Sequence, residues 1–287
     1  MTTFPLVLDA HGKHAQAVHL TRDGKRLVSC GQDARVRVWS VPSFKAERVL
    51  EGHEKSVNAL SFTADEKRLV TASSDPAVKV WSFADGKPLH SFEKQIHGAV
   101  SPDGVHVATI SRKGELTLWD GDTGKSLKTL PTLDKRHLVL AFAANGLFLF
   151  VGGTGPIHRV ALPDGVVDGV HQWHQIGVAC LRASPNPAIL ASTGLDGTLR
   201  FWTVVGGDEV NCVPLKTTGV LQLAFAPHGR EVAVSVDHAV LVLSAPDGEL
   251  RQRFEVPVKG VYGVALSTDG RFLANAAADG RVRVWEL

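Results

Sequence analysis

Side chains that could carry out nucleophilic catalysis recur along this chain. A His, a Ser or Thr, and an Asp occur near one another in three segments of the 287-residue sequence. Such residues can form a triad, in which the His takes the proton of the hydroxyl group and the Asp orients the His. A triad needs to exist only once, however. Because these residues return in repeated segments, we interpret them as structural.

The repeated segments each close on a large apolar residue. Four strong copies, SCGQDARVRVW, TASSDPAVKVW, STGLDGTLRFW and NAAADGRVRVW, have an Asp six residues before a Trp, and TISRKGELTLW is a weaker copy. Two further copies are degenerate and close on Val or Leu. The seven closing positions are Trp39, Trp81, Trp119, Val160, Trp202, Leu243 and Trp285. The steps between them are 42, 38, 41, 42, 41 and 42 residues, and a period of about 40–45 residues is typical of β-propeller blades.

Each repeated unit is predicted to consist of about four short β-strands. Segments such as LVSC, VRVW and VNALSF alternate apolar and polar residues and are rich in Val, Thr and aromatic residues, as half-buried strands are. Turn-forming Asp-Gly and Asn-Gly pairs stand between them, for example at 23–24, 103–104 and 145–146. Helical spacing is absent over any useful length. The sequence therefore predicts an all-β fold.

Over nearly its full length the chain resembles the WD-repeat (β-transducin-like) β-propeller family. The Gly-His pair of that family is present as Gly52-His53, and its closing Trp-Asp pair as Trp119-Asp120. The resemblance implies one seven-bladed β-propeller domain over residues 1–287, closed by the N-terminal strand completing the last blade. We therefore expect residues 3–8 to pair antiparallel with residues 281–286, which would cover two exposed strand edges.

The resemblance also implies a role for the recurring polar residues. In this family a His, a Ser or Thr, an Asp and a Trp form a hydrogen-bonded set inside a blade, which pairs a largely buried carboxylate. Three blades are expected to keep the full set: His14, Ser29, Asp33 and Trp39; His53, Thr71, Asp75 and Trp81; His174, Ser192, Asp196 and Trp202. The other four blades are incomplete. The seventh keeps Asp279 and Trp285 and has Asn275 in addition.

Other catalytic and metal-binding chemistry finds little support. No phosphate-binding glycine loop and no GxSxG nucleophile motif occurs. The expected innermost strands, such as 57–62 and 261–266, contain no Asp or Glu, so a propeller-type hydrolase is a less favoured alternative. Two HxxH pairs lack a neighbouring Cys or carboxylate cluster. We expect no catalytic residues, no metal and no cofactor.

A protein partner is expected at the top face, which the resemblance places at the loops leading into first strands and the turns before the Asp. The partner-binding residues predicted there are Trp173, Arg112, Arg136, Tyr262, His19, Gln32, Asn58 and Ser74. Lys and Arg in these loops suggest a basic rim that suits an acidic or phosphorylated peptide, although solvated loop charge is an equally simple interpretation. Trp173 is either an interface anchor or a residue packed over a neighbouring loop.

These features together predict a non-catalytic scaffold or recognition subunit that binds a protein or peptide and belongs to a multi-protein complex. A nucleic-acid-binding propeller that uses the basic rim is the alternative, with Trp173 and Tyr262 as stacking surfaces. The formal net charge of +2 disfavours it. Three scattered cysteines, a start without signal-peptide character and no apolar run near 20 residues lead us to expect a cytoplasmic protein without a membrane partner.

Overall fold

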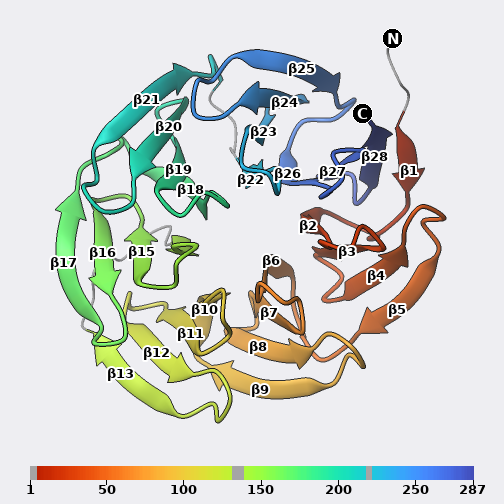
Figure 1. Ribbon diagram of the computed structural model, residues 1–287. Helices are drawn as coiled ribbons and strands as arrows, with labels where there is room; N and C mark the ends of the chain where they lie inside the picture. The colour runs from red at the N-terminus through yellow and green to blue at the C-terminus, as the bar shows by residue number, and fades with distance from the viewer. Residues whose placement is uncertain (1–4, 131–138, 218–221) are drawn as a thin grey trace. The chain divides into compact units, whose positions relative to one another are not determined.

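A computed structural model of the protein describes residues 5–130, 139–217 and 222–287. The described residues form seven four-stranded antiparallel sheets (Figure 1), and none of these residues lies in a helix. This confirms the predicted fold class, an all-β seven-bladed WD-repeat propeller fold. No described segment is a helix long and apolar enough to cross a membrane.

The strands follow the repeat found in the sequence. Blade 1 contains β2 (Ala15–Leu20), β3 (Arg26–Gly31), β4 (Val36–Ser40) and β5 (Ala46–Leu50); blade 2 contains β6 (Val57–Phe62), β7 (Arg68–Ser73), β8 (Ala77–Ser82) and β9 (Pro88–Glu93). Blade 3 contains β10 (Gln95–Val100), β11 (His106–Ser111), β12 (Leu116–Asp120) and β13 (Ser126–Leu130); blade 4 contains β14 (Val139–Phe142), β15 (Phe148–Gly152), β16 (Ile157–Ala161) and β17 (Val166–His171). Blade 5 contains β18 (Val178–Ala183), β19 (Ile189–Gly194), β20 (Thr198–Thr203) and β21 (Glu209–Pro214); blade 6 contains β22 (Leu223–Phe225), β23 (Glu231–Val236), β24 (Ala239–Ser244) and β25 (Leu250–Glu255). Blade 7 contains β26 (Val261–Leu266), β27 (Phe272–Ala277), β28 (Val282–Glu286) and, as its fourth strand, β1 (Leu6–Leu8).

The chain divides into two compact units. Unit 1 comprises residues Met1–Asn58 and Leu215–Leu287 and holds blades 1, 6 and 7. Unit 2 comprises Ala59–Pro214 and holds blades 3, 4 and 5 with nearly all of blade 2. The single domain expected over residues 1–287 therefore stays a prediction.

In unit 1 the N-terminal strand completes the last blade. Leu6, Val7 and Leu8 lie opposite Val284, Arg283 and Val282 in an antiparallel register. The predicted closure is thus confirmed for residues 6–8, whereas residues 3 and 4 lie outside the described part of the chain. Leu8 also packs against a buried cluster that includes Trp39 and Phe272, so the strand contributes apolar burial as well as backbone hydrogen bonds.

In unit 2 the blades pack through apolar faces of their sheets. Side chains of blades 3 and 4, among them Ile110, Leu140 and Leu149, form one buried cluster. Blades 4 and 5 meet in a second cluster, which includes Phe150 and Leu181. A fully buried side chain of this size contributes about 1.5–3 kcal/mol relative to an exposed one. Successive residues of a strand point to opposite faces of the sheet, so Leu149 and Phe150 of β15 contribute to the two different clusters.

A β-bulge recurs in the fourth strand of six blades. Between the partner of the closing Trp, Val or Leu and the partner of the residue before it, the fourth strand contains one extra residue. The extra residues are Glu47, Leu89, Leu127, Asp168, Val210 and Arg251. Bulges bend a strand and increase its twist, so the outer strand of each of these blades curves away from a flat edge.

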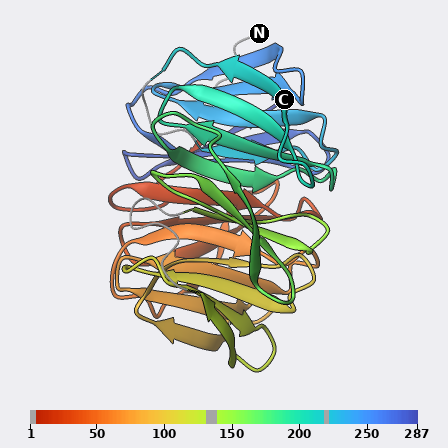
Figure 2. The same ribbon diagram turned by 90° about the vertical axis from the view of Figure 1, so that its left-hand side faces the viewer.

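Each blade has two ends, which carry different loops. We call the end where the first strand begins, with the turn between the second and third strands, the near end; it corresponds to the predicted top face. The far end carries the turns between first and second and between third and fourth strands. This follows from the antiparallel order of the strands in every sheet. Figure 2 views unit 2 from the side, with the strands running between the two ends.

Candidate functional site

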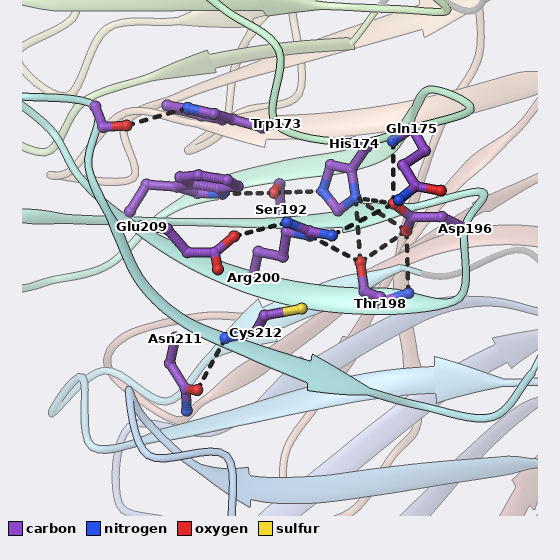
Figure 3. Close-up of polar contacts among 12 residues, drawn as sticks. Trp173, His174, Gln175, Ser192, Asp196, Thr198, Arg200, Glu209, Asn211 and Cys212 are labelled. Atoms are coloured by element: carbon purple, nitrogen blue, oxygen red, sulfur yellow. Dashed lines mark hydrogen bonds and ion pairs between the residues drawn. The ribbon is translucent and has the colours of Figure 1, made fainter.

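Blade 5 holds a continuous chain of hydrogen bonds (Figure 3). The indole N–H of Trp202 donates to Ser192 Oγ over 2.8 Å, and Ser192 Oγ lies 2.7 Å from His174 Nε2. On its other side, His174 Nδ1 lies 3.0 Å from an Asp196 carboxylate oxygen. Because Ser192 already accepts from the indole, its hydroxyl donates to Nε2, and the imidazole then donates from Nδ1 to Asp196. The structure therefore places the four residues of this blade 5 set in one hydrogen-bonded chain.

Burial and hydrogen bonding set the charges in this chain. Burial lowers the pKa of His174 below its ordinary value, and the Asp196 carboxylate only partly offsets this. Burial raises the pKa of Asp196, but hydrogen bonds from Thr198 and the neighbouring His174 outweigh it, so that pKa is lowered overall. The structure thus favours a neutral imidazole beside an ionised carboxylate.

The arrangement of Ser192, His174 and Asp196 resembles that of a catalytic triad, with Ser on Nε2 and Asp on Nδ1 of the imidazole. It lacks the access that such a triad needs. Ser192 is 0% exposed and its oxygen is held by the Trp202 indole. A substrate carbonyl cannot reach this hydroxyl. The set therefore holds the blade together, and its chemistry is structural.

In blade 1 the prediction that His14 belongs to the set is wrong, because His11 takes that place. His11 Nδ1 lies 2.7 Å from Asp33 Oδ1, and its Nε2 lies 3.0 Å from Ser29 Oγ, to which the Trp39 indole also donates. The sequence contained a signal that would have found it. His53 and His174 precede their Ser or Thr by 18 residues and their Asp by 22, and His11 has the same offsets.

Blades 2 and 3 show the indole–hydroxyl part of the set. The Trp81 indole donates to Thr71 Oγ1 over 2.8 Å, and Asp75 accepts the backbone N–H of Ala77 over 3.1 Å. His53 is buried, as a member of the set should be. In blade 3 the Trp119 indole donates to Thr109 over 2.8 Å, although Lys113 stands in the place of the Asp.

A basic residue four positions after the Asp is a partner that sequence reasoning missed. In the strong copies the motif is D-x-x-x-[RK]-x-W, and in blade 1 Arg37 Nη1 donates to Asp33 over 2.5 Å. In blade 7, which has no His in its set, Arg283 pairs with Asp279 at 2.5 Å and its side chain is 3% exposed. In blade 5 the equivalent Arg200 lies 3.9 Å from Asp196 and pairs more closely, at 2.7 Å, with Glu209.

The near end of unit 1 presents an aromatic and polar surface. Tyr262 is the bulged residue at the start of β26, and its ring lies 5.5 Å from that of His14. The amide of Gln32, exposed in the β3–β4 turn, lies 3.4 Å from His14 Nδ1. Gly260 makes room for this arrangement: it has φ +85°, and a Cβ there would lie 3.0 Å from the Tyr262 hydroxyl. Two predicted residues, Tyr262 and Gln32, are therefore brought together with His14.

The other predicted residue of blade 1 lies elsewhere. His19 is opposite Val28, close to the far end of the β2–β3 ladder, so its placement at the top face is wrong. The error has the same origin as that for His14, an alignment of the blade on Val18 instead of Ala15, where the first strand begins. Asn58 lies near the start of β6, and therefore at the near end of blade 2. It is exposed and accepts a hydrogen bond from Ser56 over 2.8 Å.

In unit 2 the predicted residues have three different outcomes. Ser74 and Arg112 are exposed in second–third-strand turns, at the near ends of blades 2 and 3. Trp173 is only 5% exposed and stacks on Trp202, with ring centroids 4.3 Å apart, so the prediction that it anchors a partner is wrong. Arg136 lies outside the described residues.

Comparison with known families agrees with this geometry. The family model described as WD domain, G-beta repeat matches residues 3–40, 44–82, 168–203 and 248–286. These segments contain the closing Trp residues of blades 1, 2, 5 and 7, the four strong copies of the repeat.

Curated relatives are similar over part of their length. The chain is 29% identical to the meiotic recombination protein rec14 of Schizosaccharomyces pombe over 39% of this chain and 37% of that protein. It is 26% identical to the WD repeat-containing protein slp1 of the same organism over 52% of this chain and 32% of slp1.

A third relative from that yeast, the target of rapamycin complex subunit wat1, is 37% identical over 34% of this chain and 32% of wat1. The matches thus span about a third of the length of each of these relatives. None of the three names describes an enzyme, and one names a complex subunit, which fits a protein-interaction scaffold. Because the family model matches just over half of the residues, this chain belongs to the WD domain, G-beta repeat family.

Proposed function

We propose that this protein is a non-catalytic scaffold or recognition subunit that binds a protein or peptide partner mainly through the near ends of its blades. The observation that carries the proposal is the group formed by Tyr262, His14 and Gln32 in unit 1. A tyrosine fixed on a bulged strand and half-buried against an imidazole loses little conformational freedom when a partner covers it. Aromatic side chains of this kind dominate the energetics of protein interfaces.

Blade 3 supports a partner segment that is acidic or phosphorylated. Its near end carries Lys94, Arg112 and Lys113, all of which are exposed, and Lys113 occupies the position at which other blades place the Asp of their set. Cationic side chains held at a strand end favour carboxylate and phosphate groups. We further propose that the protein works in the cytoplasm, as a subunit of a multi-protein complex.

Site-specific crosslinking in the cell that produces the protein tests the near-end proposal. A photoreactive residue is placed at Tyr262, at Arg112, or at Leu89 of the outer strand β9, which is also exposed. We expect the two near-end positions to capture the same protein and Leu89 to capture it at least tenfold less. Equal capture from all three positions, or capture from Leu89 alone, would contradict the proposal.

We also propose that the two compact units unfold together as one domain of residues 1–287. The antiparallel pairing of β1 with β28 couples the start and the end of the sequence within unit 1. Differential scanning calorimetry should give one transition whose calorimetric and van't Hoff enthalpies agree. Two separate transitions would show that the units are independent domains.

A further inference from the structure

The turn between the first and second strands divides the blades into two groups. In every blade this turn is five residues long, and its last residue immediately precedes the second strand. From blade 1 to blade 7 these last residues are Lys25, Lys67, Val105, Leu147, Ala188, Arg230 and Arg271. Blades 1, 2, 6 and 7 thus place a basic residue at the far end. Blades 3, 4 and 5, which are consecutive blades of unit 2, place an apolar one there.

The apolar side chains at these turns are exposed. Val105 is 47% exposed and Leu147 is 56% exposed. The turn between the third and fourth strands of blade 5 adds Val205, which is 69% exposed. We call these three residues the far-end patch. Exposed apolar side chains at the same end of consecutive sheets make that end a candidate interaction site.

Contacts between blades fix the turns that carry the patch. Asp103, in the turn of Val105, lies 3.9 Å from where a Cβ of Gly146 would stand in the next blade. The Leu147 carbonyl accepts the backbone N–H of Leu162 over 2.9 Å. From blade 4, the Arg159 guanidinium donates to the backbone oxygens of Val204, over 3.3 Å, and of Val205. The turn that carries Val205 is therefore held against blade 4.

The same kind of contact recurs along unit 2. Arg68 of blade 2 donates to the carbonyls of Gly104 and Gly121 in the turns of blade 3, over 3.1 and 2.8 Å. Lys128 of blade 3 donates to the carbonyl of Asp164 in blade 4 over 2.6 Å. A surface built on such fixed turns needs little ordering when a partner binds, which favours affinity.

The charged residues of the far-end turns in blades 4 and 5 are acidic, and the ammonium of Lys128, from β13, donates to the backbone carbonyl of Asp164 and not to its carboxylate. The far-end turns of blades 4 and 5, residues 143–147, 162–165, 184–188 and 204–208, contain Asp164 and Asp208 but no Lys or Arg. Both carboxylates are exposed. The nearby Arg159 is neutralised by Asp168, which it contacts at 2.9 Å. In the neighbouring blade 3, the far-end turns 101–105 and 121–125 contain one basic residue, Lys125.

We propose that the far-end patch is a second docking surface, which binds a protein segment that carries apolar side chains flanked by Lys or Arg. The apolar side chains of the segment pack on Leu147 and Val205, and its cations face the carboxylates of Asp164 and Asp208. Complementary charge of this kind selects the partner and speeds its association. The surface is separate from the near ends, so one protein can hold two partners at once.

A defined set of fluorescent peptides tests this proposal. Peptides of about ten residues carry two Leu, Val or Phe anchors, flanked in three parallel series by Lys, Glu or Ser. Their binding to the full chain is measured by fluorescence anisotropy. We expect the best Lys-flanked peptides to bind at least tenfold more tightly than their Glu-flanked and Ser-flanked counterparts.

Two double variants assign the binding to the patch. Leu147→Ser/Val205→Ser should weaken the Lys-flanked peptides at least tenfold, and Asp164→Lys/Asp208→Lys should remove their advantage over the Glu-flanked series. The matched control, Lys25→Ser/Arg230→Ser, changes the positions of blades 1 and 6 that are equivalent to Leu147 and should leave binding unchanged. All of these side chains are exposed or half-buried in turns, and thermal melting confirms that each variant is folded.

Three results would overturn the proposal. The first is equal binding of the three peptide series by the unaltered protein. The second is an equal loss of binding in the control variant. The third is a dimer in sedimentation velocity that Leu147→Ser/Val205→Ser converts to a monomer, because a second copy of this chain would then occupy the patch.

Discussion

The turn between the second and third strands is stabilised differently in blade 5 and in blade 7. In blade 5 the carboxylate of Asp196 is paired with a neutral imidazole, which continues through Ser192 to the Trp202 indole. In blade 7 the carboxylate of Asp279 is paired with the guanidinium of Arg283 at 2.5 Å. The position equivalent to Ser192 is Asn275, which is 0% exposed and whose side-chain oxygen and nitrogen have no hydrogen-bond partner among the described residues.

The comparison shows which part of the set the two blades share. Both blades keep an ionised Asp in the turn, and in both a neighbouring group lowers its pKa against the effect of burial. The imidazole–hydroxyl–indole chain is one way to supply that group, and a buried guanidinium is another. The Asp and its neutralising partner are therefore what the two blades have in common, and the remaining hydrogen bonds add stability to blade 5.

Removing the guanidinium should have the largest effect, and only in blade 7. Arg283→Leu leaves Asp279 without its partner in a site where the Arg side chain is 3% exposed. Breaking such a pair costs about 3–5 kcal/mol. Arg200→Leu in blade 5 should cost about 1 kcal/mol, because Asp196 keeps its hydrogen bonds from His174 and Thr198. Urea unfolding measures both, and equal losses would contradict the comparison.

The identity of the His in blade 1 gives the next largest effect. His11→Ala removes hydrogen bonds to Asp33 and Ser29 and leaves space in a buried site, which should cost about 1–3 kcal/mol. His14→Ala removes a partly exposed ring at the near end and should change the free energy of unfolding by about 0.5 kcal/mol or less. If His14→Ala proved the more destabilising in thermal melting, the assignment of His11 would be wrong.

Equivalent substitutions at the hydroxyl position should have opposite consequences. Ser192→Ala leaves the Trp202 indole and His174 Nε2 without their shared partner, at a cost of about 1–3 kcal/mol. Asn275→Ala removes two buried polar atoms that have no partner among the described residues, so it should leave the stability unchanged or raise it. The two melting temperatures, compared with that of the unaltered protein, decide this; a large loss with Asn275→Ala would mean that the Asn275 amide has a hydrogen-bond partner.

The last expected effect needs no substitution: it is a sensitivity to mild acid that blade 5 has and blade 7 lacks. The pKa of His174 and that of His11 are lowered by burial, so the unfolded chain takes up these protons first as the pH falls below about 6.5. Stability should therefore be constant above that pH and fall below it, by at most about 1.4 kcal/mol per pH unit for each group. The carboxylates contribute their loss only below about pH 4.

The double variant His11→Asn/His174→Asn tests this dependence. Its melting temperature should fall less steeply between about pH 6.5 and 5 than that of the unaltered protein. Some slope should remain, because burial also lowers the pKa of His97, to about 4, and that of His171. An unchanged slope in the variant would mean that the two imidazoles are not the acid-sensitive groups.

The repeat itself could be predicted from the sequence because every blade solves the same local problem. The steps between closing residues, the alternation of the strands and the five-residue turns all repeat, so single errors average out. The pairing of β1 with β28 was expected from the family resemblance, but its register was not. The offset of 18 residues from His to Ser or Thr, and the basic residue four positions after the Asp, were equally visible in the repeats.

What could not be predicted depends on contacts that only one blade makes. Trp173 follows no repeat, and only the packing of its ring on Trp202 shows that it belongs to the core. The two polar atoms of Asn275 look ordinary in the sequence, since their lack of a partner is a property of the neighbours. The far-end patch combines turn residues whose exposure appears only in the folded sheets.

The bulge opposite each closing residue has a consequence for the behaviour of the protein at high concentration. Six outer strands carry an extra residue at the same place, so their outward N–H and C=O groups do not form an even row. A strand of another molecule cannot lie along such an edge in regular register. These six edges therefore resist pairing with a strand of another molecule, without using any side chain that the near and far ends need for their partners.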